Sequence, residues 1–113
     1  MEKQVFGTID DVVMFGMLNG DGGRNLKDMG DGEGFEVTAA AIITPDEDEG
    51  KKTTLFLVTP GGDPVITQSV TAINTFISAV DFFGTHRLQL AKASGKSKAG
   101  RDFVNLKVTG VIR

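Results

Sequence analysis

The sequence contains no cysteine, no tryptophan and no tyrosine. Without cysteine the chain can form neither disulfides nor thiolate metal sites, and this composition fits a reducing compartment. No apolar run approaches the ~20 residues that a membrane helix needs, and the first residues lead into no signal-peptide core. We therefore expect a cytoplasmic location, which would be the host cytoplasm if the protein is viral. The aromatic residues are eight phenylalanines, so any stacking on a ligand falls to Phe.

Catalytic and metal-binding motifs are missing as well. The chain has no phosphate-binding GxxxxGK[ST] loop and no HExxH pair. The single histidine, His86, stands beside Arg87, where a structural or phosphate-contacting role fits better than a general base. The acidic residues 21, 28, 31 and 33 do not match the spacing of a calcium-binding EF-hand loop. We expect no enzyme, no cofactor and no metal site.

Charge is divided unevenly along the chain, whose net charge is −3. Residues 1–50 carry three bases and twelve acids, whereas residues 51–113 carry nine bases and three acids, which leaves +6. Residues 85–113 hold seven bases against one acid, Asp102. This division predicts one electropositive surface, which is typical of a protein that binds a polyanion.

The length of 113 residues and the 40% hydrophobic content predict one globular domain over residues 1–113. In the N-terminal half, residues 5–18 indicate one strand or two short strands, and the glycine-rich residues 19–34 indicate a long loop. Residues 35–43 and 51–58 predict a hairpin with an acidic tip at 44–50.

One helix is predicted in the C-terminal half. Ser69 or Thr67 can cap its start, and Gly84 supplies a left-handed stop. Between them, apolar residues recur every three or four positions: Val70, Ile73, Phe76, Ile77, Val80 and Phe83. The turn at residues 60–64 precedes this helix.

Two strands follow the helix, at residues 87–93 and 102–112, and a basic loop at 94–101 joins them. The resulting order, with three strands, a helix and two strands, is that of the five-stranded oligonucleotide/oligosaccharide-binding (OB) barrel, in which the helix lies between strands 3 and 4. That fold binds ligands across strands 2 and 3, beside the loops that here would be 19–34 and 94–101. Other small α+β sandwiches remain an alternative.

The last strand supplies an aromatic candidate. Val104, Leu106 and Val108 form its apolar row, so Phe103, Asn105 and Lys107 should face the other way. An outward Phe beside polar residues resembles a platform on which nucleobases stack, although a barrel mouth or a dimer interface could also cover it.

A second aromatic candidate lies on the strand at 51–58. Leu55 and Leu57 make the better core row, so Phe56 should point outward. We expect Phe6, Phe15 and Phe35 in the core. The candidate nucleic-acid-binding residues are thus Arg24, Lys27, Lys51, Lys52, Phe56, Arg87, Lys92, Lys96, Lys98, Arg101, Phe103, Asn105 and Lys107.

With these residues placed, the chain resembles the single-stranded DNA-binding proteins of tailed bacteriophages, particularly the small protein-primed podophage group. The resemblance rests on short motifs spread over most of the chain: Asn19, Gly22-Gly23, Asn25-Leu26-Lys27, Asp31-Gly32, Lys52-Thr53-Thr54 with Phe56, Ser69-Val70, His86-x-Leu88, Gly95-x-Ser97 and Gly100-x-x-Phe103-x-x-Leu106.

The resemblance implies a non-catalytic protein that coats and protects single-stranded DNA during phage replication or recombination, with other replication proteins as further partners. The chain departs from the family in lacking tyrosines, so Phe would have to stack. An acidic tail ending in Phe, as in bacterial single-strand-binding proteins, is not present. The alternative is a β-rich phage structural or assembly subunit that uses the outward Phe row as a protein interface. The oligomeric state and a preference for DNA over RNA stay open.

Overall fold

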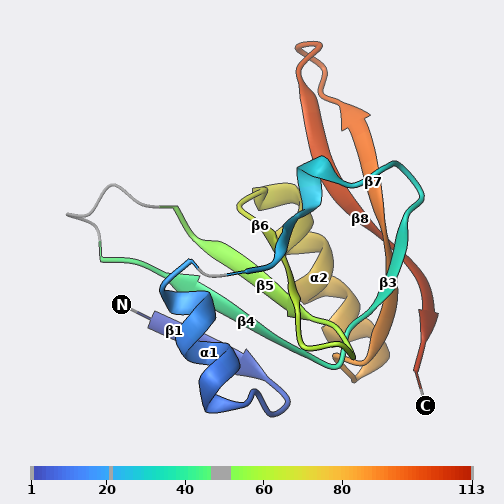
Figure 1. The fold of residues 1–113 in the computed structure, drawn as a ribbon. Helices are drawn as coiled ribbons and strands as arrows, with labels where there is room; N and C mark the ends of the chain where they lie inside the picture. Colours follow the sequence, from blue (N-terminus) through green and yellow to red (C-terminus); the bar gives the residue numbers. More distant parts are fainter. Residues whose placement is uncertain (1, 21, 47–51, 113) are drawn as a thin grey trace.

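The computed structural model describes residues 2–20, 22–46 and 52–112. Within them, eight strands form two sheets and two α-helices pack against these sheets (Figure 1). The elements are β1 (Glu2–Phe6), α1 (Asp11–Leu18), β2 (Arg24–Asn25), the 3₁₀-helix η1 (Leu26–Asp28), β3 (Gly34–Glu36), β4 (Ala39–Thr44), β5 (Thr54–Val58), β6 (Pro64–Thr67), α2 (Val70–Phe83), β7 (Leu88–Lys96) and β8 (Asp102–Val111).

The larger sheet has the strand order β1-β4-β5-β6-β2, and the smaller one has the order β3-β7-β8. Neighbouring strands are antiparallel except for the short parallel pair β2 and β6. The predicted mainly β class is confirmed. No ladder joins β6 to β8 in the part of the chain that is described, so the two sheets are not closed into one barrel.

The chain passes from one sheet to the other at Val37 and Thr38. The Val37 amide donates to the carbonyl of Leu88 on β7, whereas the Thr38 amide donates to that of Val58 on β5, each at 2.9 Å. The predicted strand 35–43 is therefore divided into β3 and β4. The sequence pattern of residues 35–43 cannot reveal this division, because side chains can alternate between two faces on either side of the bend.

Helix α2 has the caps that the sequence predicts. The Ser69 side chain accepts from the Ala72 amide, and Gly84 takes the left-handed conformation with φ of 69°. The helix buries Phe76 completely, and Phe6 packs edge-on against that ring with centroids 5.3 Å apart. Leucines from both sheets complete this main core: Leu55, Leu57, Leu88, Leu90 and Leu106.

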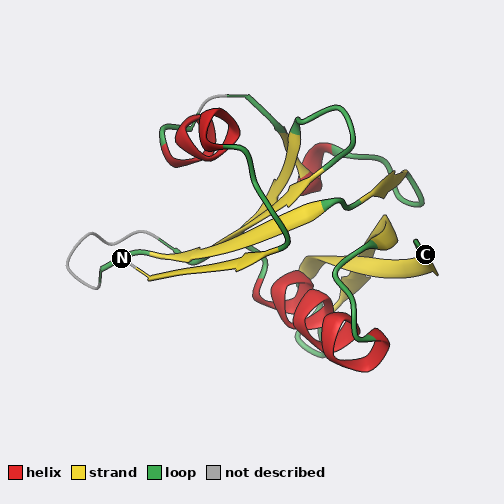
Figure 2. Cartoon of the chain, turned by 90° about the horizontal axis from the view of Figure 1, so that it is seen from below, coloured by secondary structure: helices red, strands yellow, loops and turns green. Residues whose placement is uncertain are grey.

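The prediction of strands over residues 5–18 holds only for Val5 and Phe6, which belong to β1, because residues 11–18 form helix α1. The Asp10 side chain accepts from the Val12 amide at 2.8 Å and caps the helix start. Apolar, β-branched residues after the cap favoured a strand, but β-propensity depends on context. Figure 2 shows that α1 and α2 lie on opposite sides of the larger sheet. None of the helices within the described ranges is long and apolar enough to cross a membrane.

Further differences concern loops. The predicted loop at residues 19–34 contains β2 and η1, and the turn at 60–64 leads into the unpredicted strand β6, which begins at Pro64. Strand β7 continues to Lys96, which shortens the basic loop to residues 97–101. Residues 47–50 of the expected acidic tip lie outside the described ranges.

Candidate nucleic-acid interface

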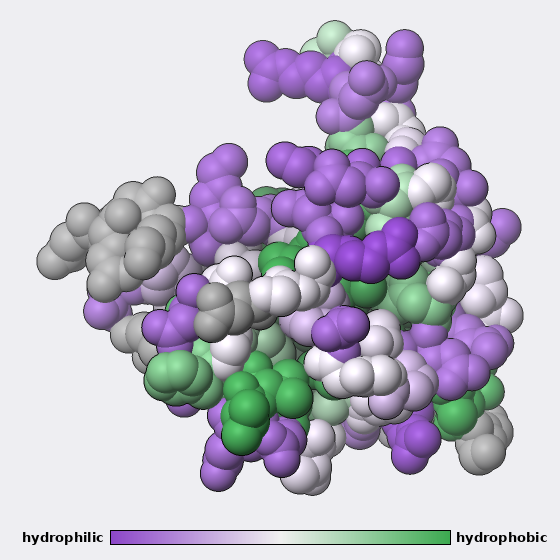
Figure 3. Space-filling view, viewed as in Figure 1, coloured by the Kyte–Doolittle hydropathy of each residue, from purple (hydrophilic) through white to green (hydrophobic). Residues whose placement is uncertain are grey.

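The β7–β8 hairpin carries three exposed bases at its tip. Lys96 pairs in register with Asp102, and the turn beyond them is closed by hydrogen bonds between Ser97 and Arg101. Lys96, Lys98 and Arg101 are all exposed. The hairpin projects from the body of the molecule at the top of Figure 1, and hydrophilic residues cover its end in Figure 3. This tip is a cationic arm that can reach a ligand lying across the body.

A groove with a volume of about 350 Å³ lies near the foot of this arm. One wall comes from the start of β8, and the opposite walls come from β2 and η1, from Lys52 two residues before β5, and from the junction of β6 with α2. Its lining consists of Asn25, Lys27, Lys52, Thr67, Gln68, Ser69, Phe103 and Val104. The Ser69 hydroxyl donates to the Val104 carbonyl at 2.6 Å and so fastens the start of α2 to β8. The groove thus lies where the two sheets approach each other without pairing.

Phe103 is the aromatic residue of this groove. It pairs in register with Gly95 on β7. A Cβ atom placed on Gly95 would come within 2.5 Å of the Phe103 Cζ atom, so the ring lies directly over the glycine backbone. The ring is half-buried. Gly95 therefore determines where the Phe103 ring can rest.

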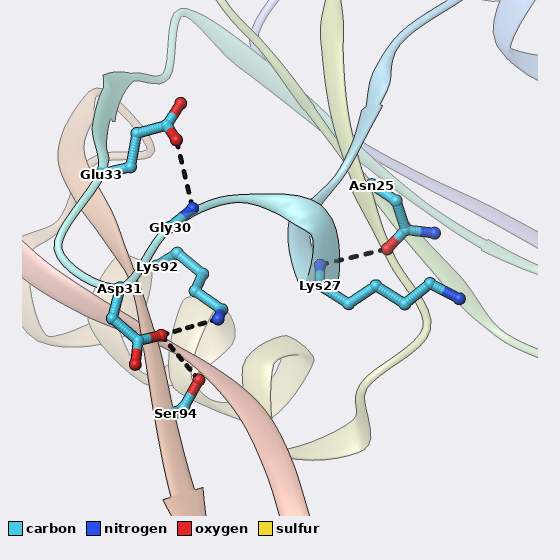
Figure 4. Close-up of polar contacts among 7 residues, drawn as sticks. All are labelled: Asn25, Lys27, Gly30, Asp31, Glu33, Lys92 and Ser94. Carbon is cyan, nitrogen blue, oxygen red and sulfur yellow. Dashed lines mark hydrogen bonds and ion pairs between the residues drawn. The ribbon is translucent and has the colours of Figure 1, made fainter.

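A polar cluster anchors the segment after η1 to β7. Asp31 accepts from the Lys92 ammonium at 2.6 Å and from the Ser94 hydroxyl at 2.8 Å, as Figure 4 shows. These two hydrogen bonds, that of Lys92 first, lower the pKa of the Asp31 carboxyl below its usual 3.8. The Lys92 side chain is only 10% exposed. Lys92 is therefore held by Asp31, and the expectation that it meets a phosphate is not supported by this geometry.

Arg24 is held in a similar way by the same segment. Its guanidinium pairs with Glu33 at 2.5 Å, and the other Glu33 oxygen accepts from the Gly30 amide at 3.2 Å. The hydrogen bond from Arg24, followed by that from Gly30, lowers the pKa of the Glu33 carboxyl. Arg24 thus stabilises the loop that shapes the groove rather than offering a free charge.

Other predicted cations keep their charge available. Among the described residues, no acid forms an ion pair with the bases around the groove, on the arm or on the exposed side of β8. These bases are Lys27, Lys52, Lys96, Lys98, Arg101 and Lys107. In Figure 4 the Lys27 side chain extends away from the Asp31 cluster, while its amide donates to Asn25 at 3.2 Å. Lys27 and Lys52 share the groove, and Lys96, Lys98 and Arg101 lie on the arm, so a single electropositive surface stays a prediction.

Phe56 is not an exposed platform, and this prediction is wrong. Leu55 and Leu57 do enter the main core, so Phe56 points to the opposite face as expected. Helix α1 covers that face, and Phe56 is only 7% exposed beneath it. The error follows from reading residues 11–18 as a strand. Conversely, Phe15, which was expected in the core, lies on α1 with 68% of its surface exposed.

Three further candidate nucleic-acid-binding residues lie away from the groove or outside the described ranges. Asn105 is half-buried, and its side-chain oxygen accepts from the Thr75 hydroxyl of α2 at 2.7 Å, so it is a packing residue. Arg87 is exposed just before Leu88, at the opposite end of the β7–β8 ladder from Lys96. Lys51 lies outside the described residues.

Sequence reasoning missed Asn25 and Gln68, which place carboxamide groups in the groove. Neither residue stands out in a polar loop, and only the meeting of β2 with β6 brings them together. The arrangement offers cations, amides and one aromatic ring, which can bind an anion with flat apolar parts. No three potential metal ligands of the His, Cys, Asp or Glu type come together among the residues described. Comparisons with family models, curated proteins and solved structures gave no match for this chain.

Proposed function

We propose that this protein binds single-stranded DNA without sequence preference and coats and protects it during replication or recombination, without catalysis. The observation that carries the proposal is the groove that combines Phe103 with Lys27 and Lys52 at the foot of a cationic arm. A resemblance to phage single-stranded DNA-binding proteins supports the same reading. We propose that the protein acts in the cytoplasm, which is the host cytoplasm if the protein is viral.

We further propose that the chain is an OB-type fold with N-terminal additions. Residues 34–44 would act as one bent first strand, since β3 pairs with β7 while β4 pairs with β5. Strands β5 and β6, helix α2, and strands β7 and β8 then follow in the order of that fold, which is often a partly open barrel. The first strand would thus be residues 34–44 rather than residues 5–18, and β1 and α1 would be the additions.

Binding would combine two interactions that need no particular base. Lysine and arginine ammonium and guanidinium groups neutralise phosphates and release counterions. Stacking on Phe103 is open to every base, because each base has an apolar face. The combination of two exposed lysines with the half-buried Phe103 ring in one groove supports this mode of binding.

A salt titration of binding to poly(dT) tests the proposal. If four or five bases neutralise phosphates, log K against log salt should fall with a slope of about −3, because each contact contributes about −0.7 on single strands. Double-stranded DNA of equal length is the control, since it lacks unstacked bases. Absence of binding to any single strand at low salt would refute the function.

The alternative, a structural or assembly subunit, draws support from a different surface. Val12, Phe15 and Leu18 form an exposed apolar stripe on α1, whereas Phe103 is half-buried. Contiguous apolar surface of this kind favours a protein contact. Phe15→Gln should dissociate an assembly in sedimentation measurements if this alternative holds. It should leave DNA binding unchanged if the chain is a DNA-binding protein.

A further inference from the structure

The face of the larger sheet that an OB-type protein would use for its ligand is covered in this chain. The fold binds oligonucleotides across strands 2 and 3, which here correspond to β5 and β6. Phe56, Val58 and Ile66 on that face belong to a second apolar cluster that includes Met17 of α1. Met17 is 4% exposed. A strand of DNA cannot reach this face while α1 is docked.

Even without α1, this face of the larger sheet would offer little to DNA. Apart from Phe56, the cluster consists of aliphatic residues and methionines: Ala39, Ala41, Ile43 and Val58 on the strands and Met17 on α1, with Ile9, Val13, Met14 and Ile66 packed against them. None of these residues carries a charge that could meet a phosphate. Burying aliphatic surface under a helix is favourable in itself, so this cluster stabilises the docked position of α1.

The cations and the available ring meet elsewhere, in the groove between β8 and the β6–α2 junction. Lys27 and Lys52 both line it together with Phe103. The Asn25 side-chain oxygen is already occupied by the Lys27 amide, which leaves its NH₂ group as a donor. Gln68 donates its NH₂ group to the Thr54 hydroxyl at 3.3 Å, which leaves its oxygen as an acceptor. The groove thus presents positive charge, one donor, one acceptor and an aromatic face.

We propose that this groove, rather than the sheet face under α1, is the binding site of one nucleotide of the bound strand. We call this binding site the seat. The base stacks on the exposed side of Phe103, its phosphate lies between Lys27 and Lys52, and its polar edge meets Asn25 and Gln68. Every nucleobase carries both hydrogen-bond donors and acceptors, so one donor from Asn25 and one acceptor from Gln68 do not select a sequence. This inference rests on the proposed function and fixes where on the molecule it takes place.

Gly95 is the positioning residue of this seat. Because the ring rests on the glycine backbone, a methyl group at this position would collide with the ring at 2.5 Å and displace it from its present position. Gly95→Ala should therefore weaken binding about as much as the loss of stacking does, ~5- to 150-fold. The salt slope should not change, because no phosphate contact is lost.

Tryptophan fluorescence tests the seat directly, because the natural chain contains neither Trp nor Tyr. Phe103→Trp places the single fluorophore in the groove, and Phe15→Trp places it on the exposed side of α1. On addition of oligo(dT), a stacked base should quench the Phe103→Trp emission strongly, whereas the Phe15→Trp emission should stay constant. If the emission of Phe15→Trp changes and that of Phe103→Trp does not, α1 is displaced and the DNA uses the sheet face. This result would overturn the seat.

The outcomes separate this inference from the proposed function. If the wild-type chain binds oligo(dT) but Phe103→Trp shows no quenching, the seat is wrong and the function stands. If the wild-type chain binds no single strand, both are wrong.

If Phe103→Trp does not fold, salt titrations of the variants Lys27→Ala and Lys52→Ala test the seat instead. Lys3→Ala on β1 is the control, because it removes the same charge outside the groove. Each groove variant should reduce the salt slope by about 0.7, and Lys3→Ala should not. Equal effects of all three would overturn the seat.

Discussion

The two helices of this chain cover opposite faces of the larger sheet, and they differ in what they bury. Helix α2 buries Ala72, Ile73, Phe76 and Ala79 in the main core, while α1 buries Met17 alone. Helix α2 is also tied to β8 by the hydrogen bond from Ser69 to Val104 and therefore helps to shape the groove. Helix α1 instead keeps apolar residues on its outer side. The groove proposed to bind DNA therefore lies at the start of α2, while α1 covers the opposite face of the larger sheet.

The largest expected effect tests whether α2 holds the fold together. Phe76→Ala removes a fully buried ring that contacts Phe6 and leaves a cavity in the main core. We expect a loss of ~3–5 kcal/mol in the free energy of unfolding. Urea denaturation followed by circular dichroism measures it. A loss below about 1 kcal/mol would be in the range of a surface substitution. It would mean that α2 is not the principal helix of the core.

The matching change on the other side is Met17→Ala. It removes the one fully covered side chain of α1, and we expect a loss of about 2 kcal/mol, at the lower end for core methionines. Hydrogen exchange should show the loss mainly as faster exchange within α1. The affinity of the folded protein for oligo(dT) should stay unchanged. Weaker DNA binding would contradict the division between the two sides.

Phe103→Ala sharpens the comparison by separating stacking from packing. We expect single-strand affinity to fall by ~1–3 kcal/mol, with little change in the salt slope. If the half-buried ring is mainly a core residue, the same variant would instead lose ~3–5 kcal/mol of stability. Titration and denaturation of this one variant distinguish the two cases, and a destabilised protein that binds normally when folded would refute stacking.

A smaller effect on stability is expected at the cationic arm. Replacing Lys96, Lys98 and Arg101 with Ala should change the free energy of unfolding by less than about 0.5 kcal/mol, because these residues are exposed. DNA binding should weaken, and the salt slope should fall by about 2 for three lost contacts. Thermal melts and a salt titration measure both. A large drop in melting temperature would show that the tip is structural.

The smallest effect concerns pH and the Asp31 cluster. The pKa of Asp31 is lowered in the folded state by Lys92 and Ser94, so its ionised form stabilises the fold above its usual pKa of 3.8. That contribution should disappear as pH falls through the lowered folded pKa. Asp31→Asn lacks it at every pH, so the melting temperatures of variant and wild type should converge as pH falls from 3.8 through the lowered folded pKa. Glu33 shifts in the same direction in both proteins and cancels. A constant difference at all pH values would rule out this linkage.

Local signals in the sequence were reliable where one residue decides one feature. Ser69 and Gly84 define the ends of α2, and alternation along residues 102–112 predicts β8. The bases near the groove were identified because exposed charge is readable without a fold. Asp10 was equally local, but its capping role was hidden by the β-branched residues after it.

Other features depended on contacts between distant segments. Period-two reasoning placed Phe56 correctly on the face opposite the leucines, yet whether that face meets water depends on α1. Likewise, Lys92 and Arg24 count as free bases in the sequence, but Asp31 and Glu33 pair with them after the 26–33 segment folds back. The sequence showed these charges and not their partners.

The sequence by itself determined the mainly β class, the capped helix α2, and the concentration of positive charge in the second half of the chain, because caps, alternation and charge are properties of neighbouring residues. Only the tertiary structure decided which sheet face is covered, which bases stay unpaired, and that Asn25, Lys52 and Phe103 share one groove. These outcomes depend on packing and ion pairs between segments far apart in the chain, and the free energy of such contacts is not encoded in any local pattern.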